Sequence, residues 1–223
     1  MSTRIEYIQM MPHFVGLSSS EYDSIRQYFF EKKVSRGEIL IFEGDSADTL
    51  FFVVEGVVKV FKTSTEGKEQ IFQIIRPGES FNDVPVFAGE SNLASAEAMS
   101  NVIICAIKKS EMGKIIGEYP KVATNVIRIL SERVAQLVSL VEDLSFRNVT
   151  GRVAKVLLEY AGAESDDKPR LTQQEMAAMI GTAREMVGRS LKTLEEEGTI
   201  RMEHNRVVIT NQETLMALAG ISK

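Results

Sequence analysis

Residues 171–192 read LTQQEMAAMIGTAREMVGRSLK. The stretch holds two Thr-x-x-Glu capping boxes ten residues apart, at 172–175 and 182–185, and each predicts the first turn of a helix. Gly181 stands where a helix commonly ends. The stretch therefore predicts a first helix of about seven residues, a glycine turn and a second helix, which is the spacing of a helix-turn-helix. A two-helix hairpin that only forms core is the alternative.

The second of these helices is predicted to have two unlike faces. At about 100° per residue, its apolar stripe comprises Ala183, Val187, Leu191 and Leu194. Glu185, Arg189 and Lys192 fall within roughly 60° of one another on the opposite side, with Arg184 at the edge. An arginine can fork onto guanine O6 and N7, and a glutamate can accept from cytosine N4. The polar face therefore has the chemistry of a recognition helix in a major groove, although a solvated charged face is the alternative.

A small β element is predicted after this helix. The segments 200–202 and 206–209 are short and apolar, and they flank a turn at His204-Asn205. Together they predict a wing-like hairpin. Its Arg201 and Arg206 could contact DNA phosphates, which position a protein without reading sequence, or they could be exposed strand charges without a role.

A long helix is predicted from the residue after Pro120 to about Phe146, without an internal Gly or Pro. Apolar residues recur along it at alternating steps of four and three: Ala123, Ile127, Leu130, Val134, Leu137, Val141 and Leu144. A period of 3.5 held over about three heptads favours pairing with a second copy of the helix as a coiled coil. The alternative is that the stripe buries the helix against its own β domain. Val126, Ile129 and Leu140 broaden the apolar face, so the helix could do both.

The first half of the chain has strand character. Short β-branched and aromatic runs, bounded by Gly, Asp or Pro turns, occur at 38–42, 50–54, 57–61, 70–75 and 102–107. Many short strands at this spacing predict a barrel or sandwich of antiparallel hairpins. Ahead of them, Ser18 and Glu21 form a capping box that predicts a short helix running toward Phe30.

The composition of the 223 residues is that of an ordinary soluble globular protein, with 44% hydrophobic and 26% charged residues. No run approaches the roughly 18 apolar residues of a membrane span, and MSTRIEYIQMMPHF at the start lacks the apolar core of a signal peptide. A cytoplasmic location without membrane association is therefore expected. The net charge of -5 argues against coating of nucleic acid, but residues 147–223 contain 11 basic and 11 acidic side chains and can present a local basic face.

The scarcity of cysteine and histidine excludes several chemistries. The single cysteine, Cys105, lies in an apolar run and is expected to be a buried structural thiol. His13 and His204 stand near opposite ends of the chain, so a zinc site with several His and Cys ligands cannot be built, nor can a cysteine-ligated iron-sulfur cluster. Each histidine is expected at the surface or in a turn. An enzyme with a metal-bearing β-barrel is therefore disfavoured, and no catalytic or metal-binding residue is predicted.

The chain resembles the cyclic-AMP receptor protein and fumarate-nitrate reductase regulator (Crp-Fnr) superfamily over nearly its whole length. The DNA-reading signature of that family, Arg-Glu-x-Val-Gly-Arg, stands at 184–189 within a similar helix-turn-helix. The N-terminal run resembles the family's cyclic-nucleotide-binding β-roll, with characteristic turns at Gly37, Gly44-Asp45, Gly56 and residues 77–81. Residues 148–152 resemble the hinge into the DNA-binding domain.

The resemblance implies an α+β protein that works as a ligand-responsive, homodimeric transcription regulator. Residues 1–120 would form an antiparallel, jelly-roll-like effector domain, 121–147 a dimerisation helix, and 148–223 a winged helix-turn-helix. The dimer would contact two TGTGA-like half-sites of double-stranded DNA one helical turn apart, with RNA polymerase as a further partner. The predicted DNA-binding residues are Thr172, Gln174, Thr182, Arg184, Glu185, Arg189 and Lys192.

The resemblance departs from the family pattern in the effector site. Members that bind cyclic AMP have Phe-Gly-Glu followed by an Arg-Ser or Arg-Thr pair, whose arginine neutralises the cyclic phosphate. This chain has Phe81-Asn82-Asp83, and residues 90–96 contain no arginine. Because a buried phosphate without a partner cation is costly, this argues against cyclic AMP. The cysteine group of iron-sulfur members is also absent, which leaves another small molecule, a haem with atypical ligands, or no ligand.

The implied effector pocket lies between this region and the long helix around residues 130–137. Its predicted residues are Gly78, Glu79, Phe81, Asn82, Asp83, Asn92, Leu93 and Ala94. A ligand there would shift the population of coiled-coil registers, or of conformations of a hinge at 145–148, and so change the spacing of the recognition helices. A cyclic-nucleotide-binding regulatory module without DNA binding is the alternative function, but it should have an intact phosphate cassette and no second module.

Overall fold

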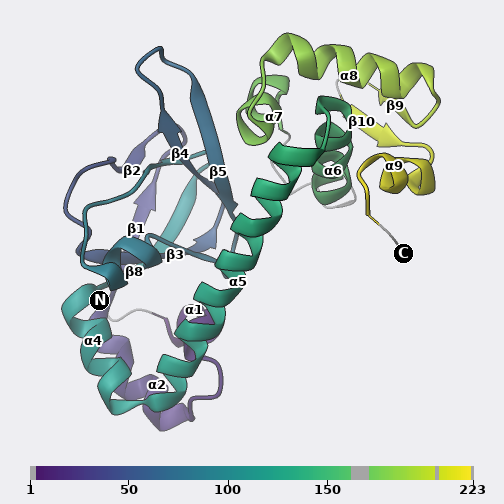
Figure 1. Cartoon of the computed structure of the whole chain (residues 1–223). Helices are drawn as coiled ribbons and strands as arrows, with labels where there is room; N and C mark the ends of the chain where they lie inside the picture. Colours follow the sequence, from purple (N-terminus) through teal and green to yellow (C-terminus); the bar gives the residue numbers. More distant parts are fainter. Residues whose placement is uncertain (1–3, 162–170, 204–205, 222–223) are drawn as a thin grey trace. The chain divides into compact units, whose positions relative to one another are not determined.

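The computed structural model describes residues 4–161, 171–203 and 206–221 (Figure 1). The chain divides into two compact units. One comprises residues 1–63 and 71–136, and the other comprises residues 64–70 and 137–223. The α+β class predicted from the sequence is confirmed, with a β-roll in the first part of the chain and a helix-turn-helix in the last.

The β-roll consists of two four-stranded sheets whose paired strands run antiparallel. The first sheet has the strand order β1 (Phe29–Val34), β8 (Val102–Lys108), β3 (Thr49–Glu55) and β6 (Ser80–Phe81). The second has the order β2 (Ile39–Ile41), β7 (Ser95–Ala98), β4 (Val58–Thr63) and β5 (Glu69–Ile75). The predicted runs became β2, β3, β4, β5 and β8, whereas β1, β6 and β7 had not been predicted.

The central strand β8 of the first sheet is buried on both faces, which explains why residues 102–107 are all apolar. Successive side chains of a strand point to opposite faces. Ile104 and Ala106 accordingly join the core between the two sheets, whereas Cys105 and Ile107 join the core against the N-terminal helices. Cys105 is fully buried, which confirms the structural thiol.

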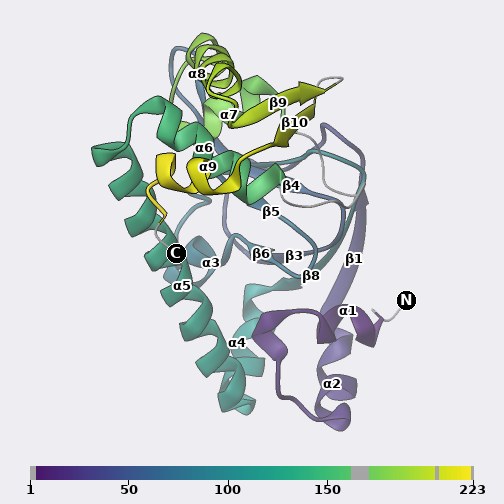
Figure 2. The ribbon, with the colours of Figure 1, turned by 90° about the vertical axis from the view of Figure 1, so that its right-hand side faces the viewer.

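Short helices cover the outer face of this sheet at one end of the roll (Figure 2). These are α1 (Ile5–Gln9), η1 (Pro12–Phe14), α2 (Ser19–Ile25), η2 (Arg26–Tyr28) and α4 (Lys109–Glu118). The predicted capping box opens α2: the Ser18 hydroxyl accepts from the Glu21 amide, and the Glu21 carboxylate accepts from the Ser18 amide at 2.6 Å. The helix runs toward Phe30 as predicted, through α2 and η2, and ends at Tyr28 because Phe29 pairs with Ile107 as the first residue of β1.

The long helix α5 (Pro120–Phe146) is present with the predicted length. One face packs on the β-roll, where Val122, Val126 and Ile129 are buried. Leu130 of the predicted heptad seam is half-buried against the same core. Ala123, the first residue of the series, is also half-buried, whereas five seam residues are largely exposed in the single chain: Ile127 66%, Val134 60%, Leu137 55%, Val141 63% and Leu144 47%. The helix therefore buries one apolar face within its own chain and leaves a second one uncovered.

The C-terminal elements form a winged helix-turn-helix around their own core. They are α6 (Val149–Ala161), α7 (Gln173–Ile180), α8 (Arg184–Glu196), β9 (Ile200–Glu203), β10 (Arg206–Ile209) and α9 (Gln212–Leu218). Residues such as Val153, Leu157 and Met176 are buried between these helices. Gly151 lets α9 approach α6, since a Cβ at this position would lie 2.8 Å from the Leu218 carbonyl oxygen. Over the described residues, none of the helices combines the length and the apolar character that a membrane span needs.

Candidate nucleic-acid interface and effector region

The first helix of the motif, α7, begins and ends as the sequence predicts. The Thr172 hydroxyl accepts from the Glu175 amide at 3.1 Å, and the Glu175 carboxylate accepts from the Thr172 amide at 2.6 Å. Gly181 then adopts a left-handed conformation with φ 67°, and the helix before it has eight residues. Thr172 and Gln174 are both exposed at the start of α7.

The start of the second helix, α8, differs from the prediction. Thr182 with Glu185 does not form a capping box, because the residue that precedes the helix is Ala183 and no side chain caps it. The Thr182 amide instead donates to the Ala177 carbonyl at 3.0 Å, a bond that belongs to the end of α7. Thr182 is therefore held in the turn between the helices, and α8 starts at Arg184.

The two faces of α8 are separated as predicted. Val187, Leu191 and Leu194 are buried, whereas Ala183 is exposed because it lies before the helix. The solvent face carries Arg184, Glu185, Arg189 and Lys192. The side chains of the first three form no hydrogen bond or ion pair with the described residues, and Lys192 lies 3.6 Å from the Glu196 carboxylate on the same face. The side chains of Arg184, Glu185 and Arg189 are therefore available to bind a ligand.

Two polar contacts that the sequence analysis did not predict hold α7 and α8 on α6. Ser190 is 3% exposed, and its hydroxyl lies 3.1 Å from that of Thr150. Arg152 donates to the Ile180 carbonyl at 2.8 Å and so satisfies a free carbonyl at the end of α7. A serine beside the apolar stripe of α8 was the available signal, but its partner lies 40 residues away in the sequence.

The predicted wing is present as the antiparallel pair β9 and β10, in which Ile200 lies opposite Ile209. Arg201 forms an ion pair with Glu203 on the same strand. The turn at His204-Asn205 lies outside the described residues, as does the side chain of Arg206.

The predicted effector residues lie at two separate places in the β-roll. Asn82, between β6 and α3 (Asp83–Ala88), has a φ of 70°. Asparagine tolerates this left-handed conformation better than most residues, so it can stand where the family has glycine. Its side-chain amide donates to the Thr49 carbonyl at 3.1 Å. Phe81 is buried and stacks on Phe51, with ring centroids 5.0 Å apart.

Asp83 is the centre of a buried polar cluster. One carboxylate oxygen accepts from the Ser80 hydroxyl at 2.8 Å and from His13 Nε2 at 3.0 Å, and the other accepts from Arg133 at 2.7 Å. Arg133 comes from α5 and donates also to the side chain of Gln73 at 2.7 Å. His13, expected at the surface or in a turn, lies in the 3-10 turn η1 but is only 1% exposed, so the surface alternative was wrong. Its ring enters the core because Asp83 provides a partner there.

The titration of Asp83 reflects these contacts. Burial alone raises the pKa of the Asp83 carboxyl, but the hydrogen bond from His13 and the positive charge of Arg133 outweigh it. The pKa therefore stays below its ordinary value, and the carboxylate is ionised at neutral pH.

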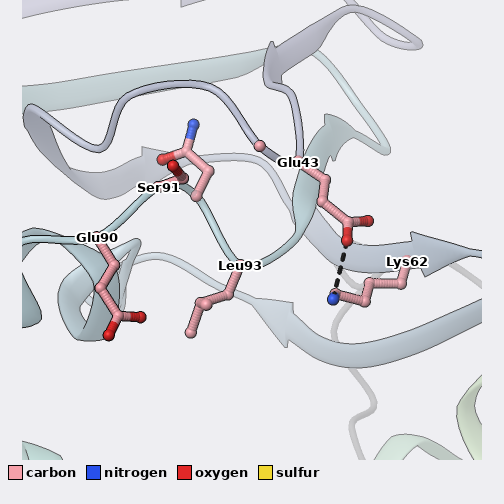
Figure 3. A pocket seen from close by; sticks show the side chains of 7 residues that line it. Glu43, Lys62, Glu90, Ser91 and Leu93 are labelled. Atoms are coloured by element: carbon pink, nitrogen blue, oxygen red, sulfur yellow. Dashed lines mark ion pairs between the residues drawn. The ribbon is translucent and has the colours of Figure 1, made fainter.

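The other predicted effector residues lie away from this cluster. Asn92 and Leu93 line a surface pocket together with Glu43, Gly44, Lys62, Glu90 and Ser91 (Figure 3). Lys62 is 2.8 Å from the Glu43 carboxylate, which neutralises it within the pocket. The Glu79 carboxylate accepts from the Arg76 amide at 2.7 Å in a turn that includes Gly78, and Ala94 is half-buried. Among the described residues, no three His, Cys, Asp or Glu side chains lie where they could hold a metal.

Comparisons with known families and proteins agree on both parts of the chain. Residues 31–119 match the family model of the cyclic nucleotide-binding domain, and residues 151–218 match that of the Crp-like helix-turn-helix domain.

Individual relatives match along most of their length. The chain is 31% identical to the cAMP-activated global transcriptional regulator CRP of Pasteurella multocida, over 76% of this chain and 85% of that protein. It is 28% identical to the CRP-like cAMP-activated global transcriptional regulator of Mycobacterium tuberculosis, over 91% and 93%. The fold is similar to that of FixK2 from Bradyrhizobium japonicum, with a TM-score of 0.78 at 23% identity, covering 87% of this chain and 99% of that one.

Replacing Asp83 by Asn should destabilise the protein. We expect a loss of about 3 kcal/mol in the free energy of unfolding at pH 7, measured by urea denaturation, because Arg133 would lose its buried counter-charge. Since the pKa of Asp83 is lowered in the folded state, the difference is fully present above the unfolded-state pKa of about 3.9 and disappears as the pH falls through the folded-state pKa.

Asp48→Asn is the matched control. Asp48 pairs with Lys108 at 2.9 Å on the surface, so its replacement should change stability by less than about 1 kcal/mol. An Asp83→Asn variant as stable as the wild type at pH 7 would contradict the stabilising role of the cluster.

Proposed function

The chain belongs to the Crp-Fnr superfamily of transcription regulators, and from this premise we propose that it reads a palindromic DNA site as a homodimer. Its C-terminal part is a DNA-binding helix-turn-helix, and its N-terminal part is a cyclic-nucleotide-binding-type domain. The observation that carries the proposal is the solvent face of α8, where Arg184, Glu185 and Arg189 are exposed and unpaired with the described residues.

The recognition chemistry follows from how α8 is held. Val187, Leu191 and Leu194 fix its inner face in the domain core, so the arginines project from a rigid support. Arginine on guanine and glutamate on cytosine are direct readout contacts of the major groove. We assign this role to Arg184, Glu185 and Arg189, with TGTGA-like half-sites as the target. We assign contacts to the phosphate backbone to four further polar residues of the motif: Thr172, Gln174, Thr182 and Lys192.

The proposed dimer rests on the uncovered face of α5. Ile127, Val134, Leu137, Val141 and Leu144 are each at least 47% exposed and repeat with the heptad period. Burial of apolar surface contributes about 25 cal/mol per Å², so this stripe provides a strong tendency to pair. A parallel pair would place two copies of α8 on one side of the dimer, as a palindromic site requires.

We further propose that the effector is not cyclic AMP. A cyclic phosphate needs a cation, but the loop that carries Asn92 and Leu93 presents no arginine. Lys62, which lines the pocket beside it, is already paired with Glu43. In the other part of the predicted site, Arg133 is bound by Asp83. An uncharged or cationic molecule, or no molecule, fits these charges better than an anion does.

The remaining roles follow from family membership. We propose cytoplasmic action, contact with RNA polymerase and no catalytic activity. A regulatory module without DNA binding is disfavoured, because it would give no reason for the exposed Arg184 and Arg189 on a packed recognition helix.

Replacing Arg184 or Arg189 by Ala should each reduce affinity for a preferred duplex by about 1–3 kcal/mol and relax base preference at one position in each half-site. Fluorescence anisotropy with duplexes substituted at single positions measures both effects. Arg36→Ala is the control, since it removes an exposed arginine far from α8 in sequence and should leave affinity unchanged. Equal weakening on every duplex would show that the two arginines contact phosphates instead.

Replacing Leu137 by Asp should dissociate the dimer, because it introduces a charge into the middle of the proposed apolar interface. Sedimentation velocity measures the change. Gln136→Asp places the same charge on the exposed neighbouring residue outside the seam and should leave the dimer intact. A Leu137→Asp protein that sediments like the wild type would eliminate α5 as the interface.

Isothermal titration of the full chain with cyclic AMP should give no saturable heat. The physical reason is the missing arginine at residues 90–96, which leaves the phosphate without a partner. Tight binding of one cyclic AMP per chain would refute this part of the proposal, while leaving DNA recognition untouched.

A further inference from the structure

Asp143, near the end of α5, links this helix to the first helix of the DNA-binding domain. Its side chain is only 9% exposed although it is charged. One carboxylate oxygen forms an ion pair with Lys155 of α6, whose amine also donates to the Ser139 hydroxyl at 3.0 Å. The other oxygen lies 2.6 Å from Nε of Arg147, which follows α5 in the chain. One anion thus holds two cations at the junction of two helices.

The connection between the two helices is short. Only two residues, Arg147 and Asn148, separate α5 from α6. Asn148 accepts from the Gly151 amide at 2.8 Å, a bond that caps α6 but does not reach α5. A two-residue connection can change direction through a few backbone torsions. The contacts of Asp143 act across that connection, since they join α5 directly to α6.

Polar contacts couple the orientation of α6 to that of the recognition helix α8. Thr150 of α6 meets the buried Ser190 of α8, with their hydroxyl oxygens 3.1 Å apart. Arg152 of α6 donates to the end of α7 at Ile180. Both helices of the helix-turn-helix, α7 and α8, are therefore fixed to α6, the helix that Asp143 contacts through Lys155.

We propose that Asp143 is a positioning residue for DNA recognition, which sets the direction in which α6, and with it α8, leaves α5. The inference rests on the proposed function, because it matters where two copies of α8 must meet two half-sites. Loss of the carboxylate would leave Lys155 and Arg147 as two facing cations, whose repulsion favours an opened junction. The pair is mostly shielded from solvent, so salt screens it weakly.

The first test measures spacing preference. Inverted TGTGA half-sites are placed in a series of duplexes whose spacer is lengthened or shortened by one and by two base pairs, and affinity is measured by fluorescence anisotropy. Wild type should prefer one spacer. Asp143→Asn should lower that preference about five-fold or more, because a loosened junction lets α8 reach other spacings. Lys155→Met should have the same effect, and the double variant should add little to either.

Glu142→Gln is the matched control. It removes one carboxylate from the neighbouring exposed residue of the same helix and should leave the spacing profile unchanged. A merely structural role for Asp143 would lower affinity on every spacer equally. An unchanged profile in Asp143→Asn, or a uniform loss across the series, would overturn the inference.

The second test needs no DNA and separates this inference from the proposed function. Spin labels are attached to Ser145→Cys on α5 and Thr193→Cys on α8, two exposed positions within the same compact unit, in a Cys105→Ala background, and labelled chain is diluted with unlabelled chain. Double electron-electron resonance should give a narrow distance distribution, which Asp143→Asn broadens and Glu142→Gln does not. Equal distributions would overturn the inference. Broadening in a protein that binds no duplex would uphold the junction and refute DNA recognition.

Discussion

The apolar surface of α5 exceeds what its own chain can cover, and the rest of the molecule is arranged around that constraint. Val122, Val126 and Ile129 use one side of the helix to close the β-roll. Leu137 and Val141, on another side, stay more than half exposed. A helix with two apolar faces joins two bodies, and here the second body is proposed to be another copy of the chain. Symmetry then follows from the helix itself, because identical stripes pair with their own kind.

Local patterns predicted the elements whose signals lie within a few residues. The heptad steps predicted α5, the capping box at Thr172 predicted the start of α7, and short β-branched and aromatic runs predicted five strands. The start of α8 was predicted one residue early, because the Thr182 amide bonds back to Ala177 and so belongs to the preceding turn. Helix propensity could not predict this start, since the bond from Thr182 to Ala177 depends on how α7 ends.

The contacts of the buried cluster in the β-roll could not be predicted from the sequence. Asp83 was identified from the motif it interrupts, but its partners His13 and Arg133 are 70 and 50 residues away. A histidine between two hydrophobic residues gives no periodic signal, so its burial depends on a carboxylate that only the tertiary fold supplies. The same cluster bears on regulation. The Asp83 carboxylate already has protein partners at both oxygens, so an effector that binds Asp83 would have to compete with Arg133 for it.

Ser190 has a consequence for how this domain could acquire new targets. A buried hydroxyl between apolar neighbours fixes the rotation of α8 about its own axis, since turning the helix by one residue would move Ser190 away from Thr150 and bring Arg189 toward the core. The residues that would determine base specificity are therefore different from those that fold the domain. The exposed positions can be exchanged one at a time for different base preferences, while the angle of presentation stays constant.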